Sequence, residues 1–194
     1  MAANGGAVQG TALVALTCRL IAALEAEHVP YAVGGALALG YHAPPRGTRD
    51  VDLNIFLPGD ACGPAFDALR RAGVELDVDA ATKRATARGD AVGTADGIRV
   101  DVFVNSIPLH DAAFERRQRV EFAGVPCWIL SAEDLAVLKL MFNRPKDRID
   151  VEQMCFTLGA EFDYAYAMRQ LHEHVGEDER TEVLGRLRTA YGAG

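Results

Sequence analysis

Residues 31–56 of the chain read YAVGGALALGYHAPPRGTRDVDLNIF. A glycine pair, Gly34 and Gly35, ends one apolar segment, and the next apolar segment contains Asp50 and Asp52. Side chains two residues apart on a strand point to the same face, so we expect the two carboxylates to converge at the surface of a sheet. Mg²⁺ prefers hard oxygen ligands and often takes one or two carboxylates together with substrate phosphates. The stretch therefore predicts a metal and phosphate site.

The glycine pair fits the phosphate half of this prediction. We expect a short strand over residues 31–33, then the two glycines, then an Ala/Leu-rich helix over residues 34–41. Glycines let a ligand approach the backbone closely, and the first turn of a helix offers free N–H groups to a phosphate.

A third acid lies in the strongest strand pattern of the chain. Residues 98–105, IRVDVFVN, are rich in β-branched and aromatic side chains, and Asp101 stands at their centre. Arg99 and Phe103 share the side of Asp101, because side chains alternate between the two faces of a strand. A buried charge needs a partner, and a metal ion is a good candidate.

The remaining pattern predicts an α+β fold in one compact unit, with a mixed sheet and flanking helices in residues 1–130 and a helical C-terminal lobe in residues 131–194. Residues 74–97 are the least regular and suggest a short helix or strand with turns. The other predicted elements are helices over 7–26, 61–72, 131–142, 145–158, 163–175 and 178–191, a strand over 50–57, and a hairpin of 119–122 with 125–129.

Composition narrows the class of protein. The chain has 194 residues, 49% of them hydrophobic, which is enough for a real core. The apolar opening stretch carries charges and has no basic leader, so we expect neither a signal peptide nor a membrane span, and a cytoplasmic location. The net charge of −7 argues against nonspecific DNA coating, and residues 151–194 alone hold eight acids and four bases. Four scattered cysteines without a CxxC pair suggest structural thiols.

Two polar features in the second half leave alternatives open. Lys139 borders an apolar stripe of Leu135, Leu138 and Phe142, where it is either a functional cation or a surface lysine with a buried stem. The arginine cluster at residues 116–119 is either an RNA contact or a solvated face.

Taken together, the motifs resemble the DNA polymerase beta nucleotidyltransferase superfamily. The resemblance rests on the glycine pair at 34–35, the RxTxDxD stretch at 46–52 and the VDV stretch at 100–102. The LAVLK segment at 135–139, followed by RPKDRID at 144–150, is similar to the AbiEii/MenT type of nucleotidyltransferase, a toxin-associated branch. The similarity covers roughly residues 30–158.

The resemblance implies a metal and catalytic centre. Asp50, Asp52 and Asp101 would hold one or two Mg²⁺ ions, and Asp101 would also activate the attacking hydroxyl. Lys139 and Asp150 would complete the catalytic set, with Asp150 orienting either Lys139 or the acceptor.

The resemblance also implies a nucleotide site. The two glycines would cradle the β- and γ-phosphates, and cationic or hydroxyl donors would surround them. The full implied set is Gly34, Gly35, Arg46, Thr48, Lys139 and Lys146. For Asp147, an ordinary helix ion pair with Lys146 is an alternative interpretation.

The implied activity is Mg²⁺-dependent transfer of a nucleoside monophosphate from an NTP to an acceptor hydroxyl. The first acceptor is the tRNA 3′ end, with the protein acting as a toxin restrained by a cognate antitoxin protein. One alternative is an enzyme that modifies an aminoglycoside-like antibiotic or a protein side chain, which the acidic C-terminal lobe would suit. An alternative of another class is a nucleotide-binding module without catalysis.

Overall fold

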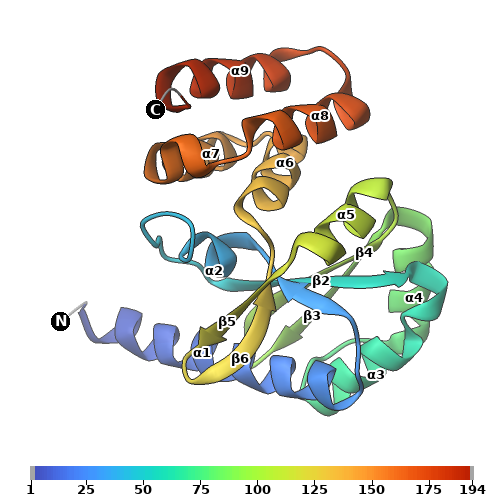
Figure 1. The fold of residues 1–194 in the computed structure, drawn as a ribbon. Coiled ribbons are helices and arrows are strands. Elements are labelled where there is room, and N and C mark those ends of the chain that lie inside the picture. The colour runs from blue at the N-terminus through green and yellow to red at the C-terminus, as the bar shows by residue number, and fades with distance from the viewer. Residues whose placement is uncertain (1–2, 193–194) are drawn as a thin grey trace. The chain divides into compact units, whose positions relative to one another are not determined.

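The computed structural model describes residues 3–192. The chain forms two compact units (Figure 1). The first, which we call the sheet unit, comprises Met1–Gly35 and Gly47–Ile129, and the second, the helical unit, comprises Ala36–Arg46 and Leu130–Gly194. The chain therefore passes from one unit to the other at three places, after Gly35, Arg46 and Ile129.

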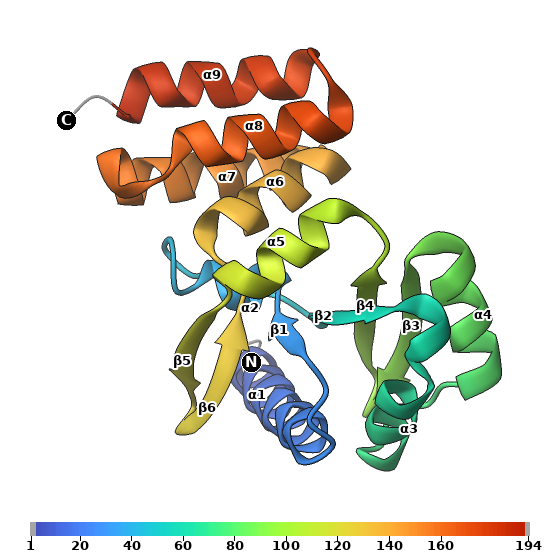
Figure 2. The same ribbon diagram turned by 45° about the vertical axis from the view of Figure 1, so that its right-hand side comes forward.

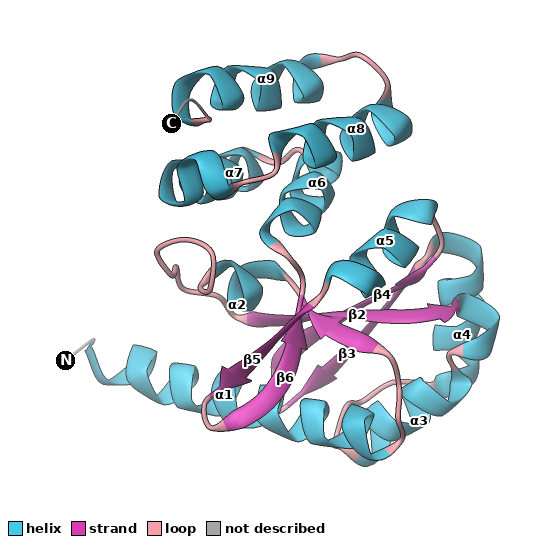
Figure 3. Cartoon of the chain, in the orientation of Figure 1, coloured by secondary structure: helices cyan, strands magenta, loops and turns pink. Residues whose placement is uncertain are grey.

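A six-stranded mixed sheet, magenta in Figure 3, organises the sheet unit. Its strand order is β3-β4-β2-β1-β6-β5 (Figure 2). Two neighbouring pairs are parallel, β2 with β4 and β1 with β6, and the other pairs are antiparallel. The strands are β1 (Tyr31–Val33), β2 (Asp50–Pro58), β3 (Asp90–Ala95), β4 (Ile98–Asn105), β5 (Gln118–Phe122) and β6 (Val125–Ile129). The predicted α+β class with a mixed sheet is confirmed.

Helices flank both faces of this sheet. They are α1 (Ala3–Ala26), α3 (Gly63–Arg71), α4 (Val78–Arg88) and α5 (Pro108–Arg116), with a short 3₁₀ turn η1 (Gly59–Ala61) before α3. Figures 1 and 2 show α1 and α3 on one side of the sheet and α5 on the other. The predicted apolar face of α1 is buried, at Leu13, Leu16, Leu20 and Leu24.

Alternation along β2 and β4 separates a core face from a polar face. Every second residue is fully buried, namely Val51, Leu53, Ile55, Val100, Val102 and Val104. The residues between them are partly exposed or polar, and they include the three acids of the sequence motifs. On this second face, α5 packs by an edge-to-face contact of Phe114 with Phe56, with ring centroids 5.5 Å apart.

The helical unit consists of α6 (Ala132–Phe142), α7 (Pro145–Leu158), α8 (Tyr164–Val175) and α9 (Glu179–Tyr191), with a 3₁₀ turn η2 (Gly159–Glu161) after α7. Helices α8 and α9 lie side by side (Figure 2). The predicted N-terminal cap of α6 is present, because the Ser131 hydroxyl accepts a hydrogen bond from the Asp134 backbone. Helix α6 is buried almost all round, and Phe142, predicted to face the core, is instead 52% exposed.

An early segment of the chain, residues 36–46, belongs to the helical unit. It contains most of the short helix α2 (Gly35–Leu39), which is shorter than predicted. The buried His42 ring lies 2.8 Å from the Leu130 carbonyl oxygen through Nε2, and burial lowers the pKa of this histidine. His42 is therefore neutral at pH 7, and its hydrogen bond to Leu130 connects residues 36–46 to the chain just before α6.

Other sequence predictions are refined. Residues 74–97 contain both a helix, α4, and a strand, β3, and α5 was not predicted at all. All four cysteines are free, and burial raises the pKa of Cys62, Cys127 and Cys155 to about 11. These three thiols are therefore protonated at neutral pH, as structural cysteines should be. In the described part of the chain, residues 3–192, no helix has the length and apolar character needed to cross a membrane.

Candidate active site

The register between two parallel strands brings the three acids together. Asp52 of β2 is the Cα partner of Asp101 of β4, and Asp50 is the partner of Arg99. Because partners in a ladder point to the same face, these four side chains form a square on the polar face of the sheet. We call Asp50, Asp52 and Asp101 the carboxylate trio.

The glycine pair supports the trio at close range. The Gly34 backbone N–H donates a 2.9 Å hydrogen bond to the Asp52 carbonyl oxygen. Gly35 has φ +55°, and a Cβ built on it would overlap the Asp52 carboxylate. The position therefore requires glycine for two reasons, a left-handed backbone and the space that the Asp52 side chain fills. Sequence reasoning assigned Gly35 to phosphate contact, and its contact with Asp52 is an addition from the structure.

Two protein donors engage the trio. The Arg99 guanidinium contacts both Asp101 oxygens, with Nε 2.8 Å from Oδ2 and Nη2 2.6 Å from Oδ1. The Thr48 hydroxyl donates a short hydrogen bond to Asp50. The bond to Asp101 and the nearby charges of Asp50 and Asp52 raise the pKa of Arg99 further above its ordinary value. Arg99 is thus a charged guanidinium paired with Asp101 at this site.

The trio fits a divalent cation in its donor chemistry. It offers three hard carboxylate groups on adjoining strands, which suits Mg²⁺. Within residues 3–192, the His, Cys, Asp and Glu side chains include no set of three that is arranged around a metal position. Hydrogen bonds orient two of these carboxylates: Arg99 donates to Asp101, and Thr48 donates to Asp50. A metal bound by all three would require rotation of these side chains, with the backbone register unchanged.

A second cluster lies within the helical unit. Lys139 of α6 donates a 2.7 Å hydrogen bond to Oδ2 of Asp150 on α7, and its ammonium is 3.9 Å from Asp147 Oδ1. Arg46 donates two bonds to Asp150, Nε to Oδ1 and Nη2 to Oδ2, both 2.8 Å long. Lys139, Asp147 and Asp150 are all buried. We call Arg46, Lys139, Asp147 and Asp150 the helical-unit ion cluster.

Electrostatics in this cluster favour the charged forms. Burial by itself would raise the pKa of Asp150, but hydrogen bonds from Arg46 and Lys139 outweigh it and hold that pKa below its ordinary value. Asp147 pairs with Arg144, 2.6 Å from Nε to Oδ2, so the predicted pair of Asp147 with Lys146 is wrong. Lys146 itself is exposed. Lys139 is not a surface lysine, because its side chain is only 7% exposed.

The predicted site residues thus fall into two groups, each assembled within one unit. The sheet unit brings together Gly34, Gly35, Thr48, Asp50, Asp52 and Asp101. The helical unit brings together Arg46, Lys139 and Asp150. Sequence reasoning missed two members, Arg99 and Asp147. For Arg99 a signal existed, because alternation already placed it on the side of Asp101.

The arginine cluster at 116–119 has a structural explanation. The Arg117 guanidinium carbon lies 3.7 Å from the centre of the Phe114 ring and 4.4 Å from that of Trp128. Arg119 forms an ion pair with Glu25. Two of the arginines are therefore engaged with groups of the sheet unit itself, which favours packing over an RNA contact for these two.

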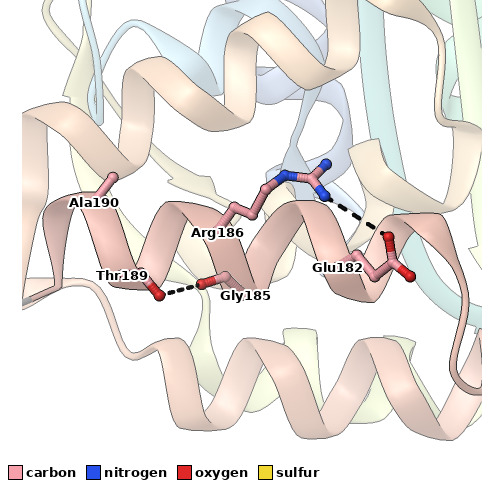
Figure 4. Close-up of a pocket in the computed structure, with 5 residues that line it drawn as sticks. All are labelled: Glu182, Gly185, Arg186, Thr189 and Ala190. Atoms are coloured by element: carbon pink, nitrogen blue, oxygen red, sulfur yellow. Dashed lines mark hydrogen bonds and ion pairs between the residues drawn. The ribbon is translucent and has the colours of Figure 1, made fainter.

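A hollow on the surface of α9 is separate from both groups. Its lining residues are Glu182, Gly185, Arg186, Thr189 and Ala190 (Figure 4). The contacts among them join successive turns of the helix, Arg186 with Glu182 at 3.7 Å and the Thr189 hydroxyl with the Gly185 carbonyl at 3.1 Å. None of the five belongs to the carboxylate trio or to the helical-unit ion cluster.

Comparison with known proteins identifies the fold. A family model described as a nucleotidyltransferase of unknown function, DUF6036, matches residues 65–186. The matched region includes Asp101, Lys139 and Asp150 and begins after Asp52. A search of curated proteins found no match.

Three solved structures of two different proteins resemble the chain over most of its length. The solution structure of the antibiotic-resistance factor ANT(2″)-Ia has a TM-score of 0.57 and 18% identity, covering 93% of this chain and 94% of that one. The crystal structure of ANT(2″)-Ia with adenylyl-2″-tobramycin has a TM-score of 0.56 and 16% identity, with coverages of 93% and 99%. A nucleotidyltransferase-like protein from Paracoccidioides brasiliensis has a TM-score of 0.50 and 16% identity, with coverages of 88% and 91%. The fold is that of the polymerase-beta-like nucleotidyltransferases, as predicted.

Proposed function

Because the chain belongs to the DUF6036 family of nucleotidyltransferases, we propose that it moves a nucleoside monophosphate from an NTP to an acceptor hydroxyl, with Mg²⁺ as cofactor. The observation that carries the proposal is the pairing of Asp52 with Asp101 in the register of β2 and β4, with Asp50 on the same face. Three carboxylates at one point of a sheet have little structural use, since aspartate is depleted in strands.

The trio would divide the work of the transfer. Asp50, Asp52 and Asp101 would hold one or two Mg²⁺ ions, which when bound neutralise the triphosphate and stabilise the attacking and leaving oxygens. Asp101 would accept the proton of the acceptor hydroxyl as its oxygen attacks the α-phosphorus, and pyrophosphate would leave. Gly35 would keep the Asp52 carboxylate in place, and Thr48 would orient Asp50.

The helical-unit ion cluster would bind phosphate. Within the cluster, Arg46 and Lys139 balance Asp147 and Asp150, and Arg144, which pairs with Asp147, adds a positive charge beside it. Two hydrogen bonds hold the Arg46 side chain on Asp150, and the side chain is 34% exposed, so its guanidinium is positioned within reach of a nucleotide. We place Asp150 as the residue that positions Arg46 and Lys139, and Gly34 and the exposed Lys146 as further nucleotide contacts.

Two acceptor classes follow from different observations. Net charge favours a small cationic molecule with hydroxyl groups, because the chain carries −7 overall and residues 151–194 carry an excess of four acids. The motif resemblance to the AbiEii/MenT type favours the tRNA 3′ end, in a toxin with a cognate antitoxin. The first is our preferred acceptor class, since a polyanion such as tRNA would need a basic surface.

Label transfer tests the reaction and the acceptor together. The purified protein is incubated with each α-³²P-labelled NTP and Mg²⁺, and with total tRNA, an aminoglycoside mixture or no acceptor. We expect label in one acceptor only, lost with EDTA and lost in Asp50→Ala. Asp67→Ala is the matched control, because the Asp67 side chain is 43% exposed and forms an ion pair with Arg70 on its own helix.

Each outcome has a distinct meaning. Label in the aminoglycosides supports the cationic acceptor, and label in tRNA supports the toxin. If neither the wild-type protein nor Asp50→Ala transfers label to any acceptor, catalysis on these acceptors is refuted. If the protein nevertheless binds NTP measurably, the result would indicate a nucleotide-binding module without catalysis.

A further inference from the structure

Arg99 lies beside the carboxylate trio and has no role in the proposed transfer reaction. It lies across from Asp50 in the register of β2 and β4, and its guanidinium covers both oxygens of Asp101. A planar guanidinium that meets a carboxylate through two donors forms the strongest kind of surface ion pair. The oxygens that it covers are the ones that a cation at Asp101 would need.

The exposure of the two partners makes this contact reversible. The Arg99 side chain is 57% exposed and that of Asp101 is 16% exposed. Arg99 can therefore swing away into solvent without disturbing the core, whereas Asp101 stays on its strand between buried valines. When the guanidinium leaves Asp101, it still faces the negative charges of Asp50 and Asp52, which raise its pKa.

A displaced arginine needs a new anion, and the reaction brings one. The triphosphate would arrive with its metal at the same face of the sheet, and phosphate oxygens accept a guanidinium as well as a carboxylate does. An exchange then becomes favourable: Asp101 passes from Arg99 to the metal, and Arg99 passes from Asp101 to the phosphates.

We propose that Arg99 is a built-in counter-ion that occupies Asp101 in the empty enzyme and yields it only when a metal–triphosphate complex binds. This inference rests on the proposed function, because it takes the trio as the metal site. Arg99 is a positioning residue in this scheme, and it makes metal loading at Asp101 depend on the nucleotide.

Two binding measurements test the proposal, because the Arg99→Gln substitution should change the two affinities in opposite directions. The first titrates Mn²⁺ alone into the protein by calorimetry, with Mn²⁺ as the spectroscopic and chemical stand-in for Mg²⁺. The second titrates an α,β-methylene NTP analogue at saturating Mg²⁺. In Arg99→Gln we expect Mn²⁺ to bind roughly fivefold more tightly and the analogue roughly fivefold more weakly, the size of one exposed ion pair. A merely structural residue would weaken both ligands or neither.

A matched variant separates the contact from net charge. Arg49 is exposed and precedes Asp50, so Arg49→Gln removes the same charge near the trio without touching Asp101. We expect its two affinities to change by less than about twofold, since exposed charges are screened by salt. Equal shifts in Arg49→Gln and Arg99→Gln would overturn the proposal, because charge alone would then explain them.

The remaining outcomes distinguish this inference from the proposed function. If Mn²⁺ binds wild type and Arg99→Gln equally, and Asp101→Asn abolishes binding to both, the trio holds metal and the role of Arg99 is refuted. If Mn²⁺ binding is insensitive to Asp101→Asn in every background, the metal site and the role of Arg99 both fail.

Discussion

The Asp52 carboxylate occupies the space in which a side chain on Gly35 would lie. The residue before Gly35 also contacts Asp52, because the Gly34 N–H donates a hydrogen bond to the Asp52 carbonyl oxygen. The turn after β1 and the central acid of β2 are therefore built around each other.

Gly35→Ala should reduce the transfer rate roughly 100-fold while the protein still folds. The new methyl group would displace Asp52, and a misplacement of about 1 Å at a reacting centre costs roughly 100-fold in rate. The left-handed backbone should add about 1–2 kcal/mol of destabilisation. The measurements are the transfer rate and urea unfolding. Gly10→Ala is the control, since nothing lies near its added methyl group, and it should leave the rate unchanged.

Thr48→Val should lower the transfer rate about three- to tenfold, because Asp50 loses one hydrogen bond to its carboxylate and gains freedom to rotate. Thr48→Ser keeps the hydroxyl and should restore most of the rate. The comparison is made at saturating NTP, where a loss of orientation shows in kcat. Equal rates in wild type and Thr48→Val would show that this bond does not orient Asp50.

Asp150→Asn should destabilise the protein by about 3–5 kcal/mol, because the buried Lys139 ammonium would lose its nearest carboxylate. The next one, on Asp147, is 3.9 Å away. Urea unfolding measures the change. Asp67→Asn is the control for an exposed pair and should cost less than about 1 kcal/mol. Similar losses for the two variants would contradict a special role for the helical-unit ion cluster.

The free energy of unfolding should decrease at acidic pH because the Asp150 carboxylate becomes protonated. The pKa of folded Asp150 lies below the ordinary aspartate value, so its contribution is present above that value and is lost as the pH falls through the folded pKa. Below about pH 4 the difference in unfolding free energy between wild type and Asp150→Asn should therefore shrink. Unfolding curves of both proteins from pH 7 to pH 3 test this, and a constant difference would be the opposing result.

Local patterns were enough to predict five of the six strands of the sheet unit, including the two that carry the acids. Asp50, Asp52 and Asp101 interrupt apolar strands, and alternation alone places Asp50 and Asp52 on one face of their strand. The register that sets Asp52 beside Asp101 is a property of strand pairing, which no single segment reveals. Helix α5 escaped prediction because its buried positions, Leu109, His110 and Ala113, do not form an apolar stripe that the sequence would show.

The four helices of the helical unit were predicted to within one residue, but the ion cluster that joins α6 to α7 was not. Lys139 lies on a helix that is buried on nearly every side, and whether a lysine there is buried depends on its partner on another helix. Arg46 was expected to meet phosphate, and its structural partner Asp150 is 104 residues away along the chain. A contact between residues so far apart in the sequence depends on how the helices pack, which local sequence patterns do not show.

The passage of residues 36–46 into the helical unit sets an order for biosynthesis. Arg46 leaves the ribosome early, and Asp150 only after all six strands have been made. A nascent chain thus carries the complete carboxylate trio before the helical-unit ion cluster can close. Translation that stops before α7 would release a chain that contains every strand of the sheet but lacks Asp150, so the partner that holds Arg46 would be missing.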